Sequence, residues 1–145
     1  MKSANTDKEP IDVLLVDDEQ GYLNVLSNRL ARRFVNATKA FSGTQAIQIL
    51  RKNDFDVVVL DLKMEDMDGI EVLKVMKKMV PDLPVIILTG HGSQKAAEDG
   101  IASGAFDYLT KPCELQELLD KIQDAHRFQK KTKDSVSDLN KKDDS

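Results

Sequence analysis

Acidic, hydroxyl and amine side chains follow four short apolar segments of this sequence. Asp17 and Asp18 follow the first segment, Asp61 the second, Thr89 the third and Lys111 the fourth. Two carboxylates about 4 Å apart repel each other by about 4 kcal/mol at an effective dielectric constant of 20, so three neighbouring acids need a cation to stay ionised together. Their hard oxygen atoms suit Mg²⁺, which keeps coordination positions open for water and phosphate oxygens.

The same residue types are suited to phosphoryl transfer. A carboxylate can attack phosphorus and form an aspartyl phosphate. The transferring group spreads negative charge over its oxygens, so a metal ion and a lysine are the groups that stabilise it. Lys111 supplies an ammonium group, which is a competent phosphate partner, and Thr89 supplies a hydroxyl donor. Asp61, which ends a wholly apolar run, is the best-placed nucleophile.

Five extended segments are expected to position these residues. The run VVVL before Asp61 is apolar without alternation, which is typical of a strand covered on both faces. The segment RFVNATKAF is half polar and predicts an edge strand. The predicted strands span residues 11–16, 33–41, 57–60, 85–88 and 106–109.

Apolar residues at helical spacing predict a helix in each interval after a strand. The fourth of these helices, near Ala96 and Ile101, is weak because Gly100 lies inside it. Strands that alternate with helices indicate a parallel sheet with helices on both faces, an α/β fold. Ligands of such sheets bind outside the carboxyl ends of the strands, where the polar residues above fall.

Bulk properties limit the class of protein. The length of 145 residues predicts one domain, and we expect it to span residues 10–130, between a disordered segment at 1–9 and a polar, disordered tail at 131–145. The net charge of −4 argues against binding nucleic acid by bulk charge. The single Cys113, the short apolar runs and the polar N-terminus predict a cytoplasmic protein without a secretory signal or membrane helix.

Four motifs resemble the receiver domain of two-component response regulators, the CheY-like superfamily. They are VDDE at 16–19, DLKMEDMDG at 61–69, LTGHGS at 88–93 and GAFDYLTKP at 104–112, and the resemblance covers residues 11–128. It implies a doubly wound, flavodoxin-like (βα)5 sandwich with strand order 2-1-3-4-5. The LTGHGS stretch is most similar to receivers that precede transcriptional activator domains.

The resemblance also implies roles for individual residues. Asp61 becomes the phosphoacceptor, Asp17 and Asp18 form the acidic pocket with Asp18 as the more direct metal ligand, and the backbone carbonyl of Lys63 completes the protein ligands. The implied cofactor is Mg²⁺, with Mn²⁺ as a substitute. Thr89 and Lys111 bind the phosphoryl group.

Four further features concern switching, backbone conformation and the lifetime of the phosphoryl group. The resemblance implies that Tyr108 is the aromatic switch residue, which swings inward as Thr89 moves. It also implies a cis peptide bond before Pro112. We hypothesise that Lys63 and His91 flank the phosphoryl site and set how quickly water reaches it. Many receivers have Pro where Glu65 stands, so the loop after Asp61 is expected to be looser here.

The predicted function is a regulatory phosphoacceptor rather than an enzyme. The implied partners are a sensor histidine kinase or histidine phosphotransfer protein, an output protein, and a second copy bound through the face of the fourth and fifth helices, with no direct nucleic-acid or membrane contact. A haloacid-dehalogenase-like phosphohydrolase is the main alternative, but that family needs a second Asp where Lys63 stands. Nucleotide binding through a glycine-rich loop is a weaker alternative, because neither GxGxxG nor GxxxxGK[ST] occurs in the sequence. A constitutive docking module is the third alternative.

Overall fold

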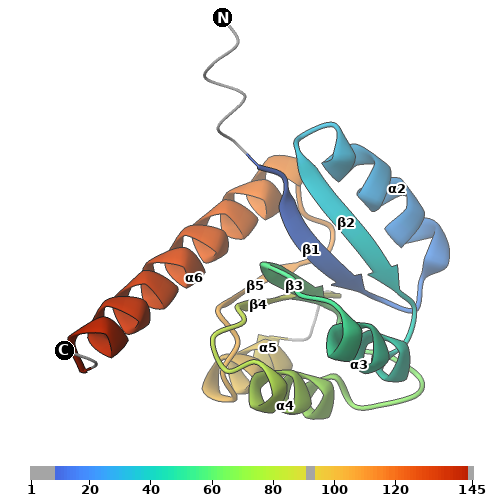
Figure 1. Ribbon diagram of the computed structural model, residues 1–145. Helices are drawn as coiled ribbons and strands as arrows, with labels where there is room; N and C mark the ends of the chain where they lie inside the picture. The colour runs from blue at the N-terminus through green and yellow to red at the C-terminus, as the bar shows by residue number, and fades with distance from the viewer. Residues whose placement is uncertain (1–8, 91–93, 144–145) are drawn as a thin grey trace, which may run out of the picture.

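Five parallel strands form one sheet with helices on both faces (Figure 1). The structure is a computed structural model that describes residues 9–90 and 94–143, with side-chain surroundings through residue 130. The sheet order is β2-β1-β3-β4-β5. The elements are β1 (Ile11–Val16), α2 (Gln20–Ala31), β2 (Val35–Ala40), α3 (Gly43–Lys52), β3 (Val57–Leu60), α4 (Gly69–Met79), β4 (Val85–Thr89), α5 (Gln94–Ala102), β5 (Asp107–Thr110) and α6 (Leu115–Asp143).

The alternation of side chains along the strands creates two cores. Leu14 and Leu60 belong to the cluster that α3 and α4 cover, whereas Val13 and Val59 belong to the cluster that α2 and α6 cover. Successive side chains of a strand point to opposite faces, so strands buried on both sides must be apolar throughout. β3 meets this demand with four buried residues, which is why the apolar run before Asp61 has no polar interruption.

The fold predicted from the sequence is confirmed, including the strand order and the helices on both faces. β2 lies at one edge of the sheet, as its half-polar sequence predicts. β4 extends one residue further than expected and includes Thr89. Within the described ranges, no helix combines the length and the apolarity that crossing a membrane requires.

The last helix is longer than the sequence analysis predicts. α6 continues to Asp143 and projects away from the sheet, so residues 131–143 are helical where disorder was expected (Figure 1). No Gly or Pro occurs in residues 114–143, and several good helix formers do, so nothing in the backbone chemistry stops the helix. The division into a core at 10–130 and flanking segments stays a prediction.

Gly100 allows α5 to approach the sheet closely. A Cβ atom at this position would lie 2.1 Å from Cδ1 of Ile87 on β4. The glycine that weakens the helix in sequence terms therefore has a packing role, because any side chain there would push α5 away from the sheet or force Ile87 to move.

Candidate functional site

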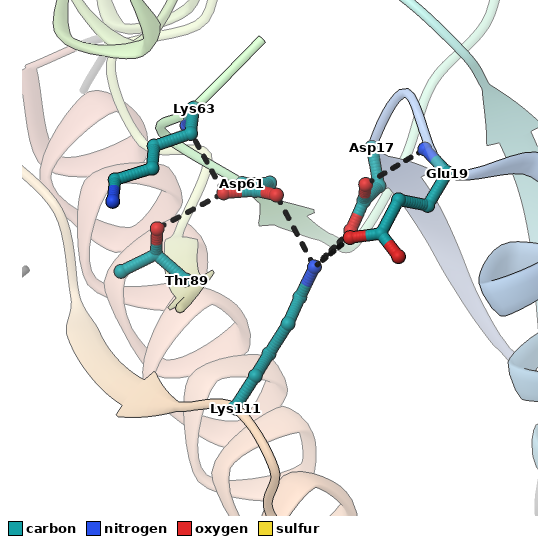
Figure 2. Close-up of polar contacts among 6 residues, drawn as sticks. All are labelled: Asp17, Glu19, Asp61, Lys63, Thr89 and Lys111. Atoms are coloured by element: carbon teal, nitrogen blue, oxygen red, sulfur yellow. Dashed lines mark hydrogen bonds and ion pairs between the residues drawn. The ribbon is translucent and has the colours of Figure 1, made fainter. Parts of the chain in front are cut away.

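The carboxylate of Asp61 lies at the carboxyl end of β3 and is only 6% exposed. Its backbone N–H donates to the carbonyl of Val16 at 2.9 Å, which ties the end of β3 to the end of β1. Its Oδ1 accepts hydrogen bonds from the backbone N–H of Lys63 and from Oγ1 of Thr89, both at 3.0 Å (Figure 2). The strand that precedes Asp61 is thus buried in the apolar core, and the side chain of Asp61, directly after the strand, enters a polar cluster.

Lys111 contacts acids from two parts of the sequence, the loop after β1 and the end of β3. Its Nζ lies 3.2 Å from Oδ2 of Asp61, 2.5 Å from Oδ2 of Asp17 and 3.6 Å from Oε1 of Glu19 (Figure 2). Burial alone would lower the pKa of this ammonium group, but the hydrogen bond to Asp17 and the charges of Asp17 and Asp61 outweigh it and raise the pKa. Lys111 is therefore fully protonated at neutral pH. The peptide bond between Lys111 and Pro112 is cis.

One ammonium group does not balance the carboxylates. Carboxylate oxygens of Asp17, Glu19 and Asp61 lie within 4.8 Å of one another. Burial raises the pKa of the Asp17 carboxyl group, and the hydrogen bonds from Lys111 and from the N–H of Glu19 offset only part of this effect. Three acids with a single ammonium partner retain an excess of negative charge, and hard oxygen donors so arranged fit Mg²⁺.

Asp18 lies apart from this group of acids. Its side chain is exposed, whereas Asp17 is 2% exposed. The structure brings together Asp17, Asp61, Thr89 and Lys111 as the sequence predicts, but places Glu19 rather than Asp18 beside them. Glu19 belongs to the VDDE motif and its side chain is exposed, but no local pattern indicates that its carboxylate, rather than that of Asp18, lies beside Asp17 and Asp61.

Tyr22 is a second residue beside Lys111 that the sequence analysis did not identify. Nζ of Lys111 lies 4.6 Å from the centre of the Tyr22 ring, a cation–π contact. Tyr22 stands in the first turn of α2, immediately after the acidic loop, and it is half-buried. The ring and the carboxylates therefore hold the same ammonium group.

The loop between β3 and α4 is closed by its own residues. The N–H of Gly69 donates to the carbonyl of Leu62 at 3.2 Å, and Asp68 caps α4 by accepting from the N–H of Ile70. A Cβ atom on Gly69 would lie 2.3 Å from Cα of Leu62, so this close approach requires glycine. The residue after Asp61 is thereby fixed by the first residue of the next helix.

Asp66 fastens the same loop to α3. Its carboxylate accepts hydrogen bonds from the N–H of Gly43 at 3.1 Å and from the N–H and Oγ1 of Thr44, both at 3.0 Å. These donors, Thr44 foremost, lower the pKa of the Asp66 carboxyl group. The loop that contains Glu65 instead of Pro is thus attached to the start of a neighbouring helix by its own Asp66 side chain.

A family model for the response regulator receiver domain matches residues 13–123. The chain belongs to the response regulator receiver family. It is 38% identical over 117 residues to the transcriptional regulatory protein GlrR of Escherichia coli, a match that covers 81% of this chain and 26% of GlrR. The chain spans about a quarter of the length of the curated relatives it matches.

Solved receiver structures have the same fold. A receiver domain protein from Clostridium thermocellum is 35% identical with a TM-score of 0.80, over 83% of this chain and 97% of that one. The receiver domain of NtrX from Brucella abortus is 29% identical with a TM-score of 0.76, over 80% and 98% of the two chains. The resemblance stated from the motifs is confirmed, and the haloacid-dehalogenase-like alternative is not favoured.

Three further residues were predicted to have roles in switching or in the lifetime of the phosphoryl group. Tyr108 is half-buried on β5 and packs against the core under α3 and α4. The side chain of Lys63 is exposed, and its backbone N–H holds Asp61. His91 lies outside the described residues. The roles given to these three residues stay predictions.

Proposed function

We propose that this chain is a phosphorylation-controlled switch with Asp61 as its phosphoacceptor. The observation that supports this most directly is the set of donors on one carboxylate, namely the N–H of Lys63, the hydroxyl of Thr89 and the ammonium group of Lys111. A phosphoryl group carries its negative charge on peripheral oxygens, and donors already directed at the acceptor carboxylate can stabilise it.

The donor is a phosphohistidine of a sensor histidine kinase or of a histidine phosphotransfer protein. A carboxylate oxygen of Asp61 forms a bond to phosphorus while the P–N bond of the donor breaks, and the electron pair of that bond returns to the imidazole nitrogen. Lys111 is permanently protonated and pairs with a phosphoryl oxygen. The chain promotes only its own phosphorylation and dephosphorylation, so its role is regulatory rather than that of a turnover enzyme.

The metal in this proposal is Mg²⁺, and Mn²⁺ substitutes for it. Asp17 and Asp61 would hold the ion with the backbone carbonyl of Lys63, and either Glu19 or Asp18 would add a carboxylate from the loop after β1. Glu19 already lies in the cluster, whereas Asp18 would have to turn inward. When bound, the ion neutralises charge between the carboxylates and the phosphoryl oxygens.

Phosphorylation then changes the population of two conformations. The side chains of Thr89 and Lys111 move toward the negatively charged phosphoryl group. Tyr108 then repacks, and the surface formed by α5, β5 and α6 changes. An output protein, or a second copy bound through the α5–α6 face, responds to that surface. The chain itself makes no contact with nucleic acid or membrane in this proposal.

The test is incubation with acetyl phosphate and Mg²⁺, followed by intact mass measurement. The mass of the parent should rise by one phosphoryl group, and that of Asp61→Asn should not. Asp54→Asn, which changes an exposed acid in the loop before β3, is the matched control and should behave like the parent. An equal mass increase in Asp61→Asn, or no increase in the parent with added Mg²⁺, would refute the assignment.

Two further measurements separate the finer parts of the proposal. Sustained turnover of a generic phosphatase substrate would contradict the regulatory role and favour an enzyme. The lifetime of the phosphorylated chain tests the side chains of Lys63 and His91 as controls of water access. If Lys63→Ala and His91→Ala leave that lifetime unchanged, those two residues do not tune it.

A further inference from the structure

Phe34 has a backbone conformation that a bulky side chain disfavours. Its φ angle is 63°, and within the described ranges it is the only residue other than glycine with a positive φ. The residue is 67% exposed, the largest fraction among the large hydrophobic residues described. Asn or Gly would adopt this conformation with less strain, so packing and turn geometry do not explain a phenylalanine at this position.

The ring borders an open groove with a volume of about 690 Å³. The groove lies between the turn that joins α2 to β2 and the middle of α6, beside Ile11 at the start of β1. It is thus at the edge of the sheet where strands begin, and Asp61 is at the edge where they end. Sites for small organic ligands have volumes of about 300–1,000 Å³, so the groove can accept such a molecule.

Positive charge collects in this groove although the whole chain has a net charge of −4. Arg33, Arg127 and Lys130 line it. Nη1 of Arg33 donates to Oε1 of Gln116 at 3.3 Å, and Arg127 pairs with Asp124. Each guanidinium group has five N–H donors, so both keep donors for an additional partner. The groove is therefore suited to an anion.

The other polar side chains of the groove indicate what kind of anion. Glu9 and Gln123 also line it. Their carboxylate and amide oxygens can accept hydrogen bonds from the amino group of a nucleobase or from ribose hydroxyl groups. An exposed aromatic ring offers a stacking surface for any base.

We propose that this groove binds a nucleoside phosphate, with the base stacked on Phe34 and the phosphates paired with Arg127 and Lys130. The phosphate contacts come from side chains, in agreement with the absence of a glycine-rich phosphate loop from the sequence. The groove is separate from the Asp61 site, because the groove lies where the strands begin and Asp61 lies where they end.

The test is calorimetric measurement of ATP and GTP binding to the full chain. EDTA is present so that no metal ion can link the nucleotide to the carboxylates around Asp61. Phe34→Asn should weaken binding about tenfold or more, because stacking of one base contributes that much. Phe34→Tyr keeps the ring and should bind like the parent. The thermal unfolding midpoint of Phe34→Asn should not fall, since Asn tolerates positive φ better than Phe. Lys130→Gln should weaken binding and reduce its dependence on salt.

Control ligands and variants decide the alternatives. Phe128→Leu, which changes another exposed phenylalanine, and Asp61→Asn should both bind ATP like the parent. Equal affinity for ATP and for inorganic triphosphate would show an anion patch without a base site. Binding of an oligoglutamate peptide in place of ATP would show a peptide surface. Each of these two results would overturn the proposal. So would the absence of any nucleotide binding, or unchanged binding by Phe34→Asn.

Discussion

The ammonium group of Lys111 lies 4.6 Å from the centre of the Tyr22 ring and 3.2 Å from the carboxylate of Asp61. Tyr22 belongs to the first turn of α2, and Lys111 follows β5 at the far edge of the sheet. The ring limits where the lysine side chain can lie, since a cation is attracted to the face of an aromatic ring. Tyr22 is thus a positioning residue for the group that pairs with Asp61.

Tyr22→Leu should slow phosphorylation by acetyl phosphate about twofold to tenfold, because a cation–π contact contributes about 0.5–1.4 kcal/mol when it is partly exposed. Tyr22→Phe keeps the ring and should restore the parent rate. The measurement is the initial rate of mass increase at saturating Mg²⁺. If the Phe variant is as slow as the Leu variant, the hydroxyl group rather than the ring is responsible. If both react like the parent, Tyr22 does not position Lys111.

Gly69→Ala should destabilise the fold by about 1–3 kcal/mol, because the added Cβ would lie 2.3 Å from Cα of Leu62 and neither backbone can yield without disturbing the other. The same displacement should slow phosphorylation, since Leu62 follows Asp61 directly. Urea unfolding measures the first effect and acetyl phosphate labelling the second. Gly21→Ala is the matched control, because a Cβ atom there has no heavy atom within 4 Å, and its stability should not fall.

Local sequence patterns were sufficient for the sheet and for most of the site. Unbroken apolar runs predicted the strands, and the residue that follows each run at a shared edge predicted the meeting of Asp61, Thr89 and Lys111. These inferences succeed because strand burial and strand direction depend on only a few neighbouring residues.

Contacts that depend on the tertiary arrangement were missed. The position of Glu19 rather than Asp18 beside Asp17 and Asp61 is set by the loop conformation after β1, which the acids alone do not specify. Asp66 accepts hydrogen bonds from Gly43 and Thr44, which lie 23 and 22 positions earlier in the chain, and no periodic pattern predicts that contact. The length of α6 was misjudged because a polar segment rich in Lys and Asp has the composition of a disordered tail as well as that of an exposed helix.

Asp66 should make the stability of this receiver depend on pH at the acid end. The pKa of this carboxyl group is lower in the folded state than in the unfolded chain, where it is near 3.8. The contribution of Asp66 to the free energy of unfolding is therefore complete above pH 3.8 and is lost as the pH falls through the lower folded pKa. Asp66→Ala should therefore lower the unfolding free energy at pH 7 by about 1 kcal/mol or less. The deficit should shrink below pH 3.8. Urea unfolding across this range measures it.

Glu65→Ala removes an exposed acid from the same loop and is the control, with no expected change in stability. A deficit for Asp66→Ala that persists undiminished under acid conditions would contradict a role for the ionised carboxylate. In that case the lost contact with α3 would be one of packing rather than of charge.

Amide hydrogen exchange should be faster in α5 than in the packed part of α6. α5 buries Ala97 and Gly100, two of the smallest residues, whereas α6 buries Leu118, Leu119 and Ile122 against the sheet. Opening α5 therefore exposes little apolar surface, and its amides should exchange about tenfold faster or more than those of residues 118–125. Mass-spectrometric exchange on the unphosphorylated chain measures this difference. Equal protection of the two helices would mean that opening α5 costs as much as opening α6, and the proposed repacking of the α5 surface on phosphorylation would lose its physical basis.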